Sequence, residues 1–153
     1  MSRRSVLMEA LGSTPRDLAR TLRRVGPEQA LARPDPRGWC IADVVAHLAD
    51  VEARYLERLH RVVAEASPTV AELRPNPSAH ELERPLAELL AAFVARRETM
   101  LAFLASLEQH QWGRRLVHET GGPTRLRDQV QALVGHDNEH LAQIATLREL
   151  LDQ

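Results

Sequence analysis

The chain has 153 residues, 44% of them hydrophobic, a formal net charge of −1 and one cysteine. This length suits a single domain spanning residues 1–153 that buries its own core. The near-neutral charge argues against nucleic acid as a partner, and the absence of lysine from the sequence excludes Schiff-base chemistry.

Four amphipathic helices are predicted in chain order. The first begins at Thr14 and Pro15, which suit an N-cap and a first helical position, and it ends near Gly26. The second covers about residues 41–66 and follows a loop rich in proline and glycine. Residues 67–84 contain three prolines and little periodicity, so they are expected to form a long crossover.

The third helix is predicted to open at Pro85 and is followed by a loop from Gln109 to Pro123. In that loop only residues 115–118 have an extended pattern, and strand signals are otherwise nearly absent. Thr124 is expected to cap the fourth helix, residues 126–151. Four helices of this length with one long connection indicate an all-α four-helix bundle.

Polar residues interrupt the apolar stripes of two predicted helices. In the fourth helix, Asp137 and His140 occupy positions where the stripe calls for apolar side chains. Burying such groups is unfavourable unless they are bonded, so the interruption marks a candidate site. Arg96 and Arg97 interrupt the third helix in the same way. One of them could face the interior and hold an anionic substrate or an acidic group, or both could reach solvent.

The spacing of the histidines indicates a metal site. His136 and His140 lie one turn apart on one helix face, where both rings can reach the same ion, although a surface or packing role is the alternative. His47, at the edge of the apolar face of the second helix, is the strongest candidate for a third ligand; otherwise it is a boundary histidine. The other histidines suit the site less well: His60, His80, His110 and His118.

Two segments resemble signatures of a known family. Residues 38–48, GWCIADVVAHL, resemble the W-S-x-x-[DE]-x-x-x-H-L signature of the DinB-like family of damage-inducible proteins. Residues 135–144, GHDNEHLAQI, resemble the H-x-x-x-H-x-x-Q-I segment near the C-terminus of that family. The resemblance extends from Thr14 to Arg148 and therefore covers nearly the whole chain.

The resemblance implies a bundle with up-down-down-up topology and a divalent metal held by His47, His136 and His140. It also implies a homodimer. The wider superfamily includes bacillithiol S-transferases and mycothiol-dependent maleylpyruvate isomerases, in which the metal activates a low-molecular-weight thiol. Zn or Ni suits a set of three imidazoles.

Several residues near these motifs are further candidates. Cys40 replaces the serine of the family signature and is either a buried inert thiol or a reactive one at a helix N-terminus, while Asp43 keeps the second half of a capping box. Trp39 either packs the loop before the second helix against the bundle or lines a substrate pocket. Asp50 could orient the ring of His47. Asp137, beside His136, is predicted to orient a ligand or to act as a catalytic acid or base.

These observations predict a metal-dependent enzyme that acts on a small-molecule substrate. In the main interpretation it activates a low-molecular-weight thiol for S-transfer to an electrophile. A metal-dependent hydrolase on the same three-histidine site is one alternative. A non-enzymatic, dimeric stress-response bundle with a structural or vestigial metal is the other.

A cytoplasmic location is expected from two features. A single cysteine excludes an intrachain disulfide and suits a reducing compartment. The arginine pair at residues 3–4 is followed by Glu9 and Gly12, which do not suit an export signal, and no apolar run is long enough to span a membrane.

Overall fold

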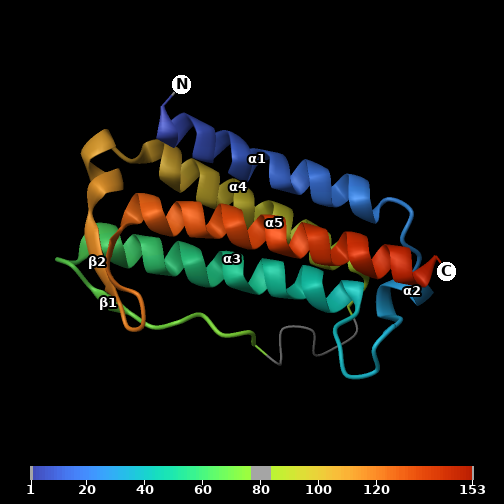
Figure 1. Cartoon of the computed structure of the whole chain (residues 1–153). Helices are drawn as coiled ribbons and strands as arrows, with labels where there is room; N and C mark the ends of the chain where they lie inside the picture. The colour runs from blue at the N-terminus through green and yellow to red at the C-terminus, as the bar shows by residue number, and fades with distance from the viewer. Residues whose placement is uncertain (1, 77–83, 153) are drawn as a thin grey trace.

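The computed structural model describes residues 2–76 and 84–152. Four long helices form the body of the molecule, and a small sheet lies at one end (Figure 1). The elements in chain order are α1 (Arg3–Leu22), α2 (Pro27–Leu31), α3 (Ile41–Ala64), β1 (Thr69–Val70), α4 (Leu86–Ser106), the 3-10 helix η1 (Gln109–Gly113), β2 (Arg115–His118), β3 (Gly122–Arg125) and α5 (Leu126–Leu151). Across the described residues, no helix combines the length and hydropathy needed to cross a bilayer.

The helices have the predicted up-down-down-up topology. α1 and α5 run in one direction, whereas α3 and α4 run in the other (Figure 1). α4 and α5 each pack against both α1 and α3, which makes a four-cornered bundle. Because α3 and α4 are parallel neighbours, the chain must return along the bundle between them, and this requirement explains the long connection.

α1 differs from the prediction that a helix begins at Thr14. It begins at Arg3 and continues through Pro15. Proline has no N–H, so the carbonyl of Leu11 loses its partner within the helix. Nη1 of Arg97 in α4 donates to that carbonyl at 2.9 Å, which satisfies it and lets the helix continue.

A buried polar layer separates two hydrophobic clusters of the core. The cluster nearer the sheet includes Leu11, Tyr55 and Met100. The other includes Leu18, Leu48, Phe93 and Ile144. Between them lie four buried polar residues, one from each long helix: Thr14, Glu52, Arg97 and Asp137. Two of the predicted interruptions of the apolar stripes, Arg97 and Asp137, thus belong to one layer.

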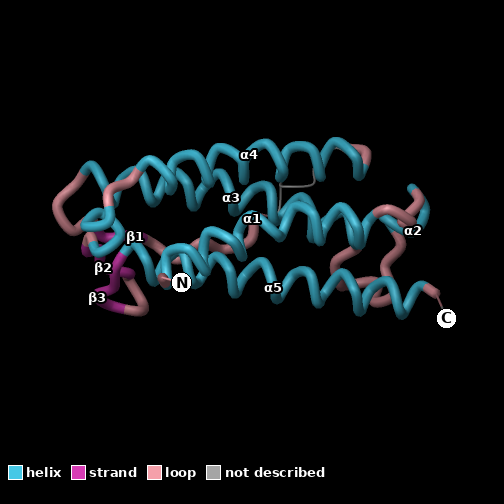
Figure 2. The backbone as a smooth tube through the Cα atoms, turned by 90° about the horizontal axis from the view of Figure 1, so that it is seen from above, coloured by secondary structure: helices cyan, strands magenta, loops and turns pink. Residues whose placement is uncertain are grey.

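The sheet has the strand order β1-β2-β3 and lies at the end of the bundle where α5 begins (Figure 2). β1 pairs in parallel with β2, and β2 pairs antiparallel with β3. The extended segment predicted at residues 115–118 is confirmed as β2, whereas β1 and β3 were not predicted. Thr124 lies in β3 and does not cap α5; the carboxylate of Asp128 accepts the backbone N–H of Arg125 there at 3.2 Å.

Candidate metal centre

Three histidines from two helices meet between α3 and α5. His47 lies in the second turn of α3, and His136 and His140 lie one turn apart in α5. Each offers one ring nitrogen, and these three atoms lie within 4.8 Å of one another. His47 is buried, while the other two are partly buried. The three residues identified from sequence are therefore brought together in a group that could hold a metal ion.

The distances between the rings are compatible with a shared cation. Nε2 of His47 and Nε2 of His136 lie 3.0 Å apart. Two nitrogens that bind one ion at about 2.0–2.1 Å are separated by roughly 3.0–3.4 Å at usual coordination angles. The ring of His140 is inclined at 70° to both of the others, so the three rings do not form a parallel stack.

Burial keeps two of the rings neutral. It lowers the pKa of His47 to about 4, and the charge of His140 acts in the same direction. Burial lowers the pKa of His136 to about 3, with further contributions from His140, His47 and Arg97. Neutral imidazole is the form that donates a lone pair to a metal. Both Nδ1 atoms are buried and have no hydrogen-bond partner among the described residues, so packing holds these rings in place.

His140 is oriented by two neighbours. Its Nδ1 lies 2.8 Å from Oε1 of Gln143, one turn further along α5. Trp39 lies parallel to the His140 ring at a centroid distance of 6.2 Å and edge-on to His47 at 5.1 Å. The loop before α3 therefore packs Trp39 against one side of the histidine cluster.

Asp137 points away from the histidine cluster and into the polar layer. Nη1 and Nη2 of Arg97 donate to its two carboxylate oxygens at 2.8 and 2.9 Å, and the Thr14 hydroxyl donates at 2.7 Å. Arg97 also pairs with Glu52 through two contacts of 2.6 and 2.8 Å. Arg97 is thus the interior-facing arginine, and it holds acidic groups. A role for Asp137 as acid or base stays a prediction.

The other predicted candidates have structural partners. Cys40 is fully buried, and burial raises the pKa of its thiol, which favours the inert interpretation. The carboxylate of Asp43 accepts the backbone N–H of Cys40 at 3.1 Å, so the capping interaction is present. Asp50 pairs with Arg54 at 2.6 Å and favours the protonated form of His47 through its charge. Arg96 donates to the carbonyl of Ala49.

The remaining histidines lie outside the cluster. His60 packs its ring against Phe103 at 4.1 Å, and His118 accepts backbone N–H groups from the turn that follows β2. His110 pairs with Glu108, and His80 lies outside the described residues.

Glu52 was not identified from the sequence. It lies beside Val51 on the apolar face of α3. An acid on an apolar helix face was the signal in the sequence that could have identified it. Its partner, Arg97, becomes evident only when α3 and α4 pack together.

Comparisons with known proteins agree with this architecture. The family model of the DinB superfamily matches residues 10–144. A Bacillus mycoides protein proposed to be a metal-dependent hydrolase is 23% identical over 147 residues, which cover 95% of this chain and 85% of that protein.

A solved structure has the same fold. YfiT from Bacillus subtilis, described as a proposed metal-dependent hydrolase with an unusual four-helix bundle topology, superposes with a TM-score of 0.86 at 21% identity. The match covers 99% of this chain and 90% of YfiT.

Proposed function

This chain belongs to the DinB superfamily, and we propose that it is a metal-dependent hydrolase in which His47, His136 and His140 bind one divalent ion. The main support is the convergence of three ring nitrogens, within 4.8 Å, from two different helices. The two relatives proposed to be metal-dependent hydrolases support the reaction class. Zn or Ni suits a ligand set made only of imidazoles.

Three protein ligands suit a catalytic ion, because they leave coordination positions open. A divalent ion held there would supply Lewis acidity, which polarises a carbonyl group and makes water a stronger acid near neutral pH. The protein would contribute neutral His47 and His136, a His140 ring fixed by Gln143, and the indole of Trp39 along one side.

In this proposal Asp137 is a positioning residue. Both of its oxygens accept hydrogen bonds from the guanidinium of Arg97, which fixes the turn of α5 that carries His136. Both oxygens are therefore already occupied by hydrogen bonds within the polar layer, which suits a positioning role.

Thiol S-transfer at the same site was the main expectation from sequence, but neither relative described above is named for that reaction. A non-enzymatic bundle is the remaining alternative. A homodimer and a small-molecule substrate stay predictions, and light scattering of the purified chain tests the first of them.

Elemental analysis of the purified protein beside two variants tests the metal site. The wild type and His60→Ala should retain one equivalent of metal, whereas His136→Ala should lose it. His60 is a matched control because it is another α3 histidine outside the cluster. Equal metal content in all three proteins would contradict the proposed ligand set.

A reaction screen tests the proposed chemistry. Esters and amides should be hydrolysed by the metal-loaded protein, and turnover should stop on chelation and return when metal is added. Turnover that requires an added thiol and electrophile would favour S-transfer. Stoichiometric metal without any turnover would favour the non-enzymatic bundle.

A further inference from the structure

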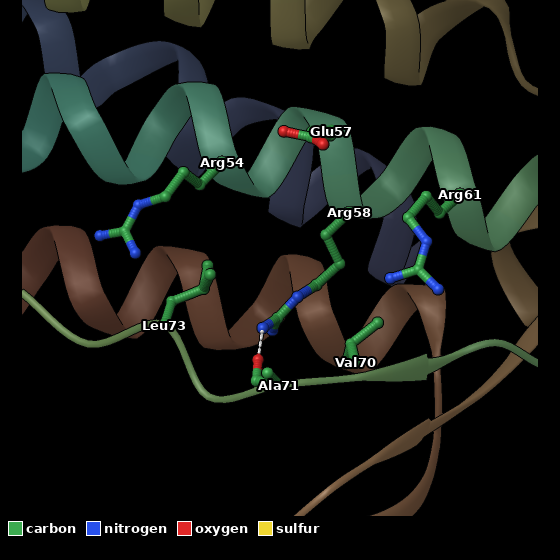
Figure 3. A pocket seen from close by; sticks show the side chains of 7 residues that line it. All are labelled: Arg54, Glu57, Arg58, Arg61, Val70, Ala71 and Leu73. Carbon is green, nitrogen blue, oxygen red and sulfur yellow. Dashed lines mark hydrogen bonds between the residues drawn. The ribbon is translucent and has the colours of Figure 1, made fainter.

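Three arginines extend from one face of α3 towards the segment that follows β1. Arg54, Arg58 and Arg61 are spaced at i, i+4 and i+7, which places them along one helix face. Figure 3 shows their side chains directed towards residues 70–73, whereas the carboxylate of Glu57 stays beside the helix. Together with Glu57 and that segment they line a cavity of about 220 Å³.

The central arginine is buried with neutral partners. Arg58 is only 7% exposed. Among the described residues, its guanidinium donates to Oε1 of Gln129, at 2.8 Å, and to the carbonyl of Ala71, and it lies over the ring of Tyr55. Neither hydrogen-bond acceptor carries a charge, so the positive charge of Arg58 is not balanced by a directly bonded carboxylate in the described part of the chain.

The other buried arginine of this protein shows what a purely structural arrangement requires. Arg97 is fully buried, and it forms ion pairs with both Glu52 and Asp137. A buried charge is stable only when a counter-charge and hydrogen bonds replace its hydration. Arg58 has the hydrogen bonds but bonds to no carboxylate among residues 2–76 and 84–152, and it lines a cavity that could admit an anion.

The two flanking arginines add guanidinium N–H donors at this cavity. Arg54 pairs with Asp50 and Arg61 with Glu65, in both cases on the surface of α3 itself. Burial lowers the pKa of Arg58, and the charges of Arg54 and Arg61 lower it further. Nε of Arg54 is buried and has no hydrogen-bond partner in the described part of the chain, so a donor next to the cavity is still free.

We propose that this cavity binds an oxyanion, the phosphate or carboxylate group of a small-molecule ligand, with Arg58 at its centre and Arg54 and Arg61 beside it. Guanidinium groups bind such anions through paired N–H donors. The volume of about 220 Å³ is smaller than that of pockets for whole drug-sized ligands, so the cavity suits an anionic group. This inference goes beyond the proposed function, because the site is separate from the histidines and does not require the metal.

Titration of the metal-free full chain with inorganic phosphate and with citrate, followed by calorimetry, tests the site. Saturable binding of at least one probe is expected. Arg58→Met and Arg54→Gln should each weaken that binding about ten-fold or more, because each removes a charged donor. Arg24→Met should leave it unchanged, because Arg24 is an exposed arginine in the turn that follows α1.

NMR of the Arg54 Nε–Hε group provides a second readout that remains available if Arg58→Met fails to fold. Its resonance should shift on titration and saturate together with the heat signal. Binding of phosphate alone identifies a phosphate site, binding of citrate alone a carboxylate site, and binding of both a general oxyanion site. The proposal is overturned if neither probe binds, or if binding is the same in wild type and Arg54→Gln.

Discussion

Replacing Arg97 with methionine should destabilise the protein strongly. Methionine replaces the aliphatic part of the arginine side chain but has no charge. The carboxylates of Glu52 and Asp137, each 1% exposed, are then left without their shared counter-charge. Removing one partner of a buried ion pair costs about 3–5 kcal/mol of unfolding free energy. For a chain of this size, that loss corresponds to a fall in Tm of roughly 6–20 °C.

Urea unfolding followed by circular dichroism measures this effect. Arg96→Met is the matched control, because Arg96 is exposed and donates a hydrogen bond to a backbone carbonyl of α3. That variant should change stability by less than about 1 kcal/mol. Adding Glu52→Gln to Arg97→Met should recover part of the loss, because one of the two unpaired carboxylates is then neutral.

The loss should also shrink as the pH falls. Burial already raises the pKa of Glu52, and Arg97 is the main opposing influence. Without Arg97 the folded state binds a proton more tightly than the unfolded state does, so acid favours folding of the variant relative to wild type. If Arg97→Met is as stable as Arg96→Met at neutral pH, the carboxylates are hydrated or neutral, and the reasoning about a buried ionic layer is wrong.

Three further predictions concern the histidine cluster and its surroundings. The metal-free protein should lose stability as the pH falls below about 6.5, because unfolded histidines then take up protons that His47 and His136, with pKa values of about 4 and 3, exclude. Urea midpoints at about pH 7 and about pH 5 measure this loss, and His47→Gln should reduce the difference between them. Gln143→Ala should weaken metal affinity about ten-fold or more, measured by chelator competition, because it releases the ring of His140; unchanged affinity would show that packing alone orients this ring. Native protein should react slowly with a thiol reagent, whereas urea should expose Cys40, which is fully buried; rapid labelling without denaturant would contradict the inert interpretation.

The sequence was most informative where the spacing of residues determines which side chains share one face of a helix. The separation of His136 and His140 by four residues places both rings on one face of any α-helix, and the apolar stripe of α3 locates His47 at the edge of the core. Bundle topology and family followed from two motifs with a long interval between them. The placement of the histidines depends on helix periodicity, which a sequence displays directly, whereas the topology and the family rest on the resemblance of the two motifs to a known family.

Features that depend on distant contacts were not predicted. Pro15 indicates a helix start when it is considered locally, yet a donor from α4 allows α1 to continue through it. Glu52 is an acid on the apolar face of α3, and its position is explained only by the ion pair with Arg97 of α4. β1 has only two residues, and it is extended because β2 provides its backbone partners. In each case the partner is far away in sequence, so no local pattern identifies it.

The guanidinium of Arg97 touches all four long helices. It belongs to α4 and bonds to Leu11 of α1, Glu52 of α3 and Asp137 of α5. Leucine contacts tolerate small sliding movements between helices, whereas these directional bonds would break if any helix shifted along its axis by one residue. Axial alignment of α3 with α5 is therefore specified five residues from His47 and directly beside His136, and the histidines should already be in register before any ligand arrives.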